Sequence, residues 1–286
     1  MLGPVSGHER AVAWAAERLG SDVVEVDELM GGWTSTMLAL TTASGERGVL
    51  RLMTNEPWRS HGAELTTREH RTQVLLTATS VPAPRSLALD ADGAATGEAA
   101  HLMTLVPGAV DLDRTSDEDL DALAATLTAV HALDPDLLPR TYQSWAWPAK
   151  YVVPDWAQDP AAWKRAFALL RQDPPSYDGT FLHRDYHPRN VLWTGSEITG
   201  VVDWVETSWG PAWLDVAHCS TNLALEHGSE VADRFAAAYV DRTGREPAPY
   251  FDVMDVVGFL PPPGRDSRIT DPSQQRRLEE RLVSLV

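Results

Sequence analysis

The chain reads FLHRDYHPRNVLW at residues 181–193 and GVVDW at residues 200–204. Asp185 and Asn190 lie in a polar loop between two short apolar segments, which predicts a strand, a loop and a second strand. Asp203 ends the next apolar segment, and a glycine turn between the two segments would return it close to Asn190. The sequence therefore predicts that one carboxylate and two further oxygen donors converge.

Phosphoryl transfer requires residues of these types. A carboxylate must lie beside the attacking hydroxyl, and oxygen ligands must hold the magnesium that bridges the phosphates. Each part of the pattern is weak alone, because His-Arg-Asp tripeptides arise by chance and an Asn in a polar loop is usually a turn former. The spacing His-x-Asp-x-x-x-x-Asn followed by a strand that ends in Asp is far more specific.

The first part of the chain contains several segments in which apolar and polar residues alternate, as in strands. A helix is predicted at 8–19 from its apolar spacing, followed by a strand at 23–29 and an antiparallel hairpin at 36–53. A helix at about 62–79 follows, and two more strands flank the turn at 90–93.

From residue 107 onward the sequence is mostly helical. Thr115 and Ser116 can cap a helix that runs to about residue 133, and residues 161–172 predict another. A sheet-first lobe followed by a helical lobe is an α+β arrangement. The expected boundaries are 1–106 for a nucleotide-binding lobe and 107–286 for a catalytic and substrate-binding lobe.

The segment HRDYHPRN resembles the catalytic loop of the aminoglycoside phosphotransferase and choline kinase superfamily, and VVDW resembles its metal-binding strand end. The resemblance extends over nearly the whole chain and implies a bilobal, protein-kinase-like fold and a small-molecule kinase. It also implies that Asp185 is the catalytic base and that Asn190 and Asp203 hold magnesium. His183 and Asp215 would brace the loop.

Two further segments are similar to nucleotide-binding parts of that superfamily. GGWTSTML at 31–38 is similar to the loop that covers the nucleotide, and LMTLVPG at 102–108 resembles the hinge between lobes. ATP is the expected nucleotide, with GTP as an alternative. The residues that these resemblances place at the nucleotide are Gly32, Thr34, Ser35, Met103 and Leu105.

The third strand carries an arginine where kinases use a lysine. The chain has no lysine before Lys150, and Arg51 stands at the matching position. An arginine stays charged and can pair with a carboxylate through two N–H groups, so the replacement is chemically workable. Glu69 is the expected partner and Glu64 the competing one.

Several features disfavour other classes of protein. The chain lacks Asp-Phe-Gly and Ala-Pro-Glu segments, and a helix-like segment follows VVDW almost at once, which leaves little chain for the peptide-docking platform of a protein kinase. The formal net charge of −17 is the wrong sign for a nucleic-acid binder. No apolar run is long enough for a membrane span. A single cysteine, Cys219, fits a reducing cytoplasm, where we expect a monomer or weak dimer.

The remaining histidines and Cys219 have ordinary interpretations. His101, His131 and His218 are most simply core or cap residues, and Cys219 is expected to be buried. Zinc is not expected, because no cysteine cluster or His-Glu-x-x-His motif accompanies His183 and its neighbours.

The acceptor is the least determined feature. Eight of the eleven tryptophans follow residue 144; they could pack in a core or form a wall that binds ammonium groups. Asp155, Glu206 and Trp209 are the candidate acceptor-binding residues. With the acidic charge, they favour a cationic acceptor, first an aminoglycoside-type antibiotic, which would make the protein a resistance enzyme. A macrolide, choline and homoserine remain alternatives, as does a non-catalytic nucleotide-binding module.

Overall fold

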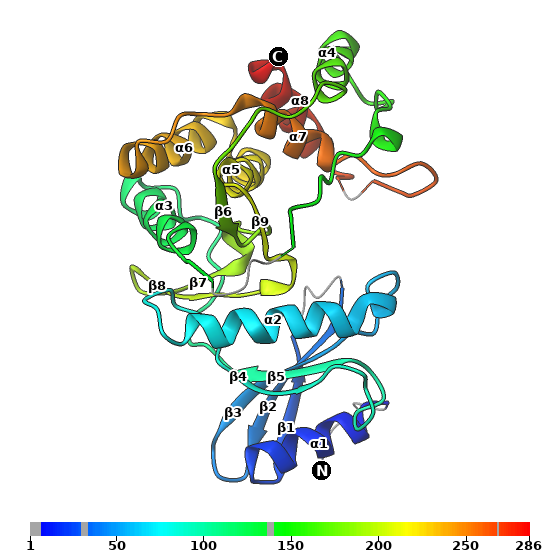
Figure 1. Cartoon of the computed structure of the whole chain (residues 1–286), viewed down its shortest axis with the longest axis vertical. Helices are drawn as coiled ribbons and strands as arrows, with labels where there is room; N and C mark the ends of the chain where they lie inside the picture. The colour runs from blue at the N-terminus through cyan, green and yellow to red at the C-terminus, as the bar shows by residue number, and fades with distance from the viewer. Residues whose placement is uncertain (1–6, 30–33, 136–139, 268) are drawn as a thin grey trace. The chain divides into compact units, whose positions relative to one another are not determined.

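The computed structural model describes residues 7–29, 34–135, 140–267 and 269–286, and the chain divides into two compact units (Figure 1). The first unit contains the residues up to Gly108 together with Thr199–Glu206, and the second contains Ala109–Ile198 and Thr207–Val286. Among the described residues, no helix is both long and apolar enough to cross a membrane. The assignment of nucleotide binding to the first lobe, and of catalysis and substrate binding to the second, stays a prediction.

The first unit is built on a five-stranded antiparallel sheet with the strand order β1-β2-β3-β5-β4. Helix α1 covers one of its faces, and α2 lies along the other (Figure 1). The elements are α1 (Glu9–Leu19), β1 (Val23–Glu28), β2 (Thr36–Thr42), β3 (Arg47–Leu52), η1 (Arg59–His61), α2 (Gly62–Leu76), β4 (Ser86–Asp90) and β5 (Ala100–Thr104).

The period of two along each strand sorts the side chains of this sheet. Leu38, Leu50 and Leu102 point toward α1 and form the core with Trp14. Arg51 is directly opposite His101 in the register of β3 and β5, so both side chains lie on the other face, toward α2. The alternation of the strands thus places an arginine beneath a helix.

A segment from late in the chain completes the first unit. Strand β8 (Glu197–Val201) leads into the short helix η4 (Trp204–Glu206), which packs against α2. Val205 joins Met53 and Leu65 in a small apolar cluster. Asp203 was expected to end a strand, but β8 stops at Val201 and Asp203 has φ of 65°. That left-handed conformation is incompatible with extended backbone, so the expectation was wrong by two residues.

The second unit is mainly helical, and α5 (Trp213–His227) is its central helix. Twelve of the fifteen residues of α5 are buried, as expected for a helix enclosed by others. The remaining elements are α3 (Asp117–His131), η2 (Pro148–Lys150), α4 (Pro160–Leu170), β6 (Gly179–Leu182), η3 (Pro188–Asn190), β7 (Val191–Thr194), β9 (Ser208–Pro211), α6 (Ser229–Thr243), α7 (Pro249–Gly258) and α8 (Pro272–Leu285).

Local signals account for several boundaries in this unit. Of the two predicted candidates, Thr115 and Ser116, it is Ser116 that caps α3, through a capping box in which its hydroxyl accepts from the Asp119 N–H and Asp119 accepts from the Ser116 backbone N–H. Strand β9 was not predicted, because its sequence Ser-Trp-Gly-Pro has little strand propensity. Its antiparallel pairing with β6 supplies the order that the local sequence lacks.

Candidate active site

The backbone of the loop between β6 and β7 is hydrogen-bonded to a buried carboxylate of α5. The backbone N–H groups of His183 and Arg184 donate to the two oxygens of Asp215 at 2.8 and 2.7 Å. His131 approaches the same carboxylate at 3.2 Å. The His183 ring nitrogen Nδ1 accepts from the Asp185 N–H at 3.2 Å. His183 and Asp215 therefore both contact the loop backbone, which is the geometry that bracing requires.

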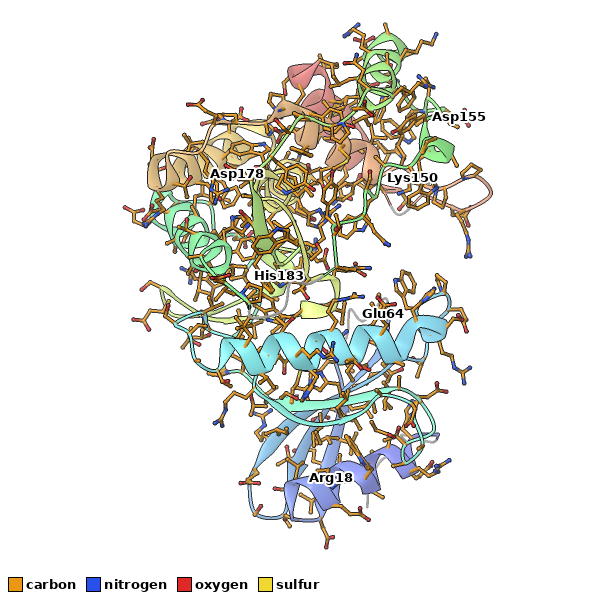
Figure 2. All side chains as sticks on the ribbon, in the orientation of Figure 1. Arg18, Glu64, Lys150, Asp155, Asp178 and His183 are labelled. Carbon is orange, nitrogen blue, oxygen red and sulfur yellow. The ribbon has the colours of Figure 1, made fainter. Side chains whose placement is uncertain are left out.

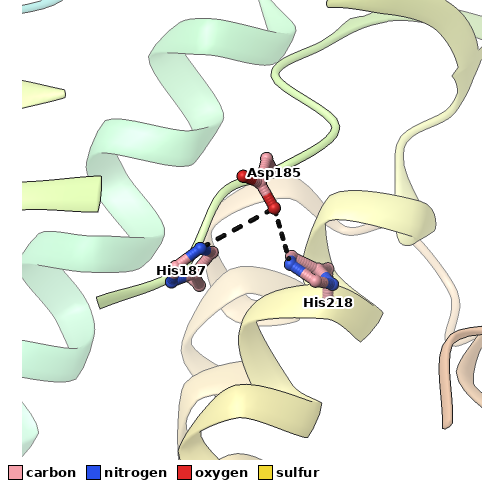
Figure 3. Close-up of side chains that lie close together, drawn as sticks. All are labelled: Asp185, His187 and His218. Atoms are coloured by element: carbon pink, nitrogen blue, oxygen red, sulfur yellow. Dashed lines mark hydrogen bonds and ion pairs between the residues drawn. The ribbon is translucent and has the colours of Figure 1, made fainter. Parts of the chain in front are cut away.

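Asp185 presents its carboxylate from this loop, with about 27% of the side chain exposed. Oδ1 lies 3.1 Å from Nε2 of His218 and 3.7 Å from Nε2 of His187, and Figure 3 shows the two imidazoles on either side of the carboxylate. Burial alone would raise the pKa of Asp185, but hydrogen bonds and charge from the two histidines hold it well below its usual value. The carboxylate is ionised at neutral pH and can accept a proton.

Asn190 lies at the end of η3 and is bound to the same loop. Its amide nitrogen donates to the backbone oxygen of Asp185 at 2.9 Å and to Oδ2 of that residue at 3.2 Å. An asparagine binds metal ions through its amide oxygen, which this arrangement does not use for the contact with Asp185. Asn190 thus combines a structural contact with a chemically suitable metal donor.

The first unit contains a buried ion cluster around Arg51. Its Nε lies 3.0 Å from Glu69 Oε2, and its Nη2 lies 3.0 Å from Asp203 Oδ1. Its Nη1 donates to the Ser35 hydroxyl at 3.1 Å. Glu64 instead pairs with Arg68 one turn away on α2. The predicted choice of Glu69 over Glu64 as the partner of Arg51 is confirmed.

Glu69 has a second partner that the sequence did not reveal. Nδ1 of His101 lies 2.9 Å from Glu69 Oε2, and Nε2 of His101 lies 2.9 Å from the Ser86 hydroxyl. Burial would raise the pKa of Glu69, but Arg51 and His101 lower it to about 2. His101 is buried, as expected, yet its role is to bridge α2 and β4. In the sequence, only the alternation of side chains along β5 could have indicated that His101 lies on the same face of the sheet as Arg51.

The other residues expected at the nucleotide lie in the first unit. Gly32 is outside the described residues. Thr34 and Leu105 are half-buried, and Met103 is buried with its sulfur accepting from the Gln73 side chain at 3.4 Å. Contact of these residues with a nucleotide stays a prediction.

The three candidate acceptor-binding residues are dispersed. Asp155 is exposed in the segment that leads to α4, where Figure 2 also labels Lys150. Glu206 is half-buried in η4 of the first unit. Trp209 lies in β9 with its indole over Gly179, where a Cβ would come within 1.9 Å of the indole nitrogen. Their roles toward an acceptor stay predictions.

Half of the eight late tryptophans lie in the core. Trp163, Trp193, Trp204 and Trp213 are buried. Of the others, Trp145 has the Arg184 guanidinium 3.9 Å above its ring, and Trp147 has the Lys150 ammonium 4.5 Å above its ring. Internal cations therefore already lie over these two indoles, as expected for core and stem packing.

The donor chemistry fits magnesium better than zinc. Asn190 and Asp203 offer an amide and a carboxylate oxygen, the ligands that magnesium prefers. Asn190 belongs to the second unit and Asp203 to the first, so their convergence stays a prediction. Ligand atoms of Asp185, His187 and His218 lie within 4.8 Å of one another, but the hydrogen bond of His218 to Asp185 and the ion pair of His187 with Asp185 account for that proximity.

Residues 25–250 match the phosphotransferase enzyme family, APH, and the chain therefore belongs to that family. It is a nucleotide-dependent, small-molecule phosphotransferase whose acceptor group is a hydroxyl. No curated protein sequence matches the chain.

Solved structures of this class share the fold at low sequence identity. The aminoglycoside phosphotransferase APH(4)-Ia, in a complex with ADP and hygromycin B, has a TM-score of 0.66 and 16% identity, over 96% of this chain and 97% of that one. The macrolide 2′-phosphotransferase MphH from Brachybacterium faecium has a TM-score of 0.59 and 19% identity, over 87% and 90%. The amicoumacin kinase hAmiN has a TM-score of 0.65 and 15% identity, over 98% and 93%. The predicted α+β, kinase-like fold is confirmed.

Proposed function

We propose that the protein transfers the γ-phosphoryl group of magnesium ATP to a hydroxyl of an amine-bearing small molecule, with an aminoglycoside-type antibiotic as the acceptor. The observation that carries this proposal is the Asp185 carboxylate, which lies beside His187 and His218 on a loop whose backbone N–H groups donate to Asp215. In this proposal Asn190 and Asp203 would hold magnesium, and Arg51 with Glu69 would contact the nucleotide phosphates.

Asp185 acts as the base in this scheme. The acceptor oxygen forms a bond to the transferred phosphorus while the bond from phosphorus to the leaving ADP oxygen breaks. The proton of the acceptor hydroxyl passes to the Asp185 carboxylate. A bound magnesium nucleotide would supply the phosphoryl group and neutralise its charge. The contribution of the protein is to orient the hydroxyl and to keep the base ionised.

Charge favours an amine-bearing acceptor. The second unit, which carries Asp185, has 26 acidic and 16 basic side chains, a formal charge of −10 out of the −17 of the chain. An acidic surface attracts cations. Exposed carboxylates such as Asp155, rather than the indoles of Trp145 and Trp147, would supply the contacts, because internal cations lie over those indoles. An enzyme of this kind would confer antibiotic resistance from the cytoplasm.

A panel of acceptors tests this proposal. Purified protein is supplied with magnesium ATP, or GTP in a parallel series, and with hygromycin B, erythromycin, choline or homoserine. ADP or GDP release is followed in a coupled assay, and mass spectrometry detects the added phosphoryl group. We expect ATP and hygromycin B to give the highest turnover. Highest turnover with erythromycin would replace the acceptor class, and nucleotide binding without any turnover would indicate a non-catalytic module.

Asp185→Asn tests the assignment of the base. The amide keeps the shape of the side chain but cannot accept the proton, so we expect turnover to fall by about 10²- to 10⁴-fold. The affinity for ATP, measured by calorimetry, should stay within about twofold, since the nucleotide contacts are assigned to other residues. Near-normal turnover of Asp185→Asn would show that the base lies elsewhere.

A further inference from the structure

One histidine of α5 joins the Asp185 carboxylate to a second, buried carboxylate. Nε2 of His218 lies 3.1 Å from Asp185 Oδ1, and Nδ1 of His218 lies 3.0 Å from Asp255 Oδ1. The Asp255 side chain is 1% exposed and the His218 side chain 6% exposed. The three residues come from the loop, α5 and α7, and they form one continuous chain of hydrogen bonds within the second unit.

The proton inventory of this chain requires a charged imidazole. An ionised carboxylate can only accept hydrogen bonds, and a neutral imidazole carries one N–H. Two carboxylates on opposite ring nitrogens are both satisfied only when the two nitrogens are protonated. Burial opposes this charge, but Asp255 and Asp185 raise the pKa of His218 to about 9. The two carboxylate contacts thus favour the imidazolium form of His218 at neutral pH.

The ring of His218 is also fixed by packing. Phe259 stacks on it with ring centroids 5.8 Å apart, and Trp145 meets it edge-on at 5.1 Å. Besides the two carboxylates, the titratable side chain of His187 meets the ring edge-on, with the centroids 5.4 Å apart. The Asn222 amide nitrogen donates to the His218 backbone oxygen at 2.9 Å and lies 3.3 Å from Nε2. A side chain confined on these sides can hold a partner in one orientation.

We infer that His218, anchored by Asp255, is a positioning residue that fixes the orientation of the Asp185 carboxylate for the incoming hydroxyl. This inference rests on the proposed role of Asp185 as the base. The carboxylate has about four lone-pair positions, of which His218 and His187 face Oδ1 and Asn190 faces Oδ2. The three contacts fix the direction of the one lone-pair position that remains, and the acceptor hydroxyl would bind there.

Phosphoryl transfer depends mainly on positioning and electrostatic stabilisation, and a misplacement of about 1 Å can cost about 10²-fold in rate. Loss of the His218 contact should therefore lower kcat and leave the KM for ATP unchanged. If His218 only stabilised the fold, replacing it would lower the amount of active enzyme. The size of that loss would not depend on whether the new side chain has a donor in the place of Nε2.

Paired substitutions separate these roles. In His218→Gln the amide nitrogen can occupy the place of Nε2 and donate to Asp185, whereas His218→Leu is of similar size and cannot donate. We expect His218→Leu to lower kcat by about 10²-fold and His218→Gln to retain activity within about tenfold. Cys219→Ala, which alters the adjacent buried residue of α5, is the matched control and should keep the kcat of the wild type. All are assayed with ATP and hygromycin B and, in parallel, with the slow hydrolysis of ATP by water.

Nitrogen NMR of labelled histidine provides a readout that needs no acceptor. The His218 signals are identified by their absence from His218→Gln. At pH 7 both ring nitrogens should be protonated, and Asp255→Asn should lower the pKa of His218. A neutral His218 at pH 7 would contradict the inference, as would equal losses of kcat in the Gln and Leu variants or a kcat of His218→Leu close to that of the wild type. Near-normal turnover of Asp185→Asn would instead reject the proposed base, which keeps the two failures distinct.

Discussion

The Arg51 guanidinium divides its N–H groups among Glu69, Asp203 and Ser35. A lysine has one compact ammonium group and could not face the three side chains in this planar arrangement. Burial opposes ionisation of Arg51, but Asp203 and Glu69 raise its pKa, so the residue stays charged. The arginine therefore links a strand, a helix and the segment that carries Asp203.

Replacing Arg51 should test how far this cluster stabilises the first unit. Arg51→Ala removes the arginine partner of the buried Glu69, and breaking a buried pair in this way costs about 3–5 kcal/mol. Arg51→Lys keeps the charge and should cost less. The free energy of unfolding in urea at pH 7 measures both. Arg59→Ala is the control, because its pair with Glu98 is partly exposed and such pairs contribute about 1 kcal/mol or less. Equal losses in Arg51→Ala and Arg59→Ala would contradict the expectation.

At the scale of elements, the β6–β9 pairing sets where the active-site loop begins. Thr180 pairs with Gly210, and Leu182 pairs with Ser208. A Cβ on Gly210 would lie 2.6 Å from Tyr142 Cδ1 and 3.0 Å from Leu182 Cδ1. Leu182 is three residues before Asp185, so the close approach at Gly210 determines how the loop enters the site.

Gly210→Ala should therefore disturb both stability and turnover. Overpacking of this kind costs about 1–3 kcal/mol. In a Tyr142→Ala background the nearer contact is gone, so the added cost of Gly210→Ala should be smaller. Urea unfolding of the two single variants and the double variant measures the coupling between these sites. Simple additivity of the two losses would show that Tyr142 is not the neighbour that excludes a side chain here.

The elements and the site differ in how much of them the sequence predicts. The hairpin and the helices were predictable because alternation, helical spacing and the Ser116 cap are local signals. The loop residues Asp185 and Asn190 carry a recognisable spacing. His218 does not, because its partners are 33 and 37 positions away and only the packing of α5 with the loop and α7 brings them together. Strand β9 was missed for the same reason, since its order comes from its partner.

At the scale of the whole molecule, the net charge of −17 bears on acceptor binding. The Debye length, over which charges interact, shortens from about 10 Å at 0.1 M salt to about 3 Å at 1 M. If about three amine–carboxylate contacts of about 0.5 kcal/mol each are screened, affinity should fall on the order of tenfold. Calorimetry with hygromycin B at the two salt concentrations measures this change, and erythromycin serves as the comparison. A salt-insensitive affinity for hygromycin B would contradict a role of the acidic charge in recognition.

The composition of the first unit has a consequence for how the protein is made. The segment Thr199–Glu206 is translated about ninety residues after Gly108, yet it supplies Asp203 to Arg51 and Val205 to the cluster around Met53. At bacterial and eukaryotic elongation rates of about 5–20 residues per second, that interval is roughly 5–20 s. During that interval the nascent first unit has Arg51 and Glu69 without Asp203, and Met53 lacks its contact with Val205. The two units therefore cannot mature one after the other on the ribosome, and the N-terminal one must wait for most of its successor to be synthesised.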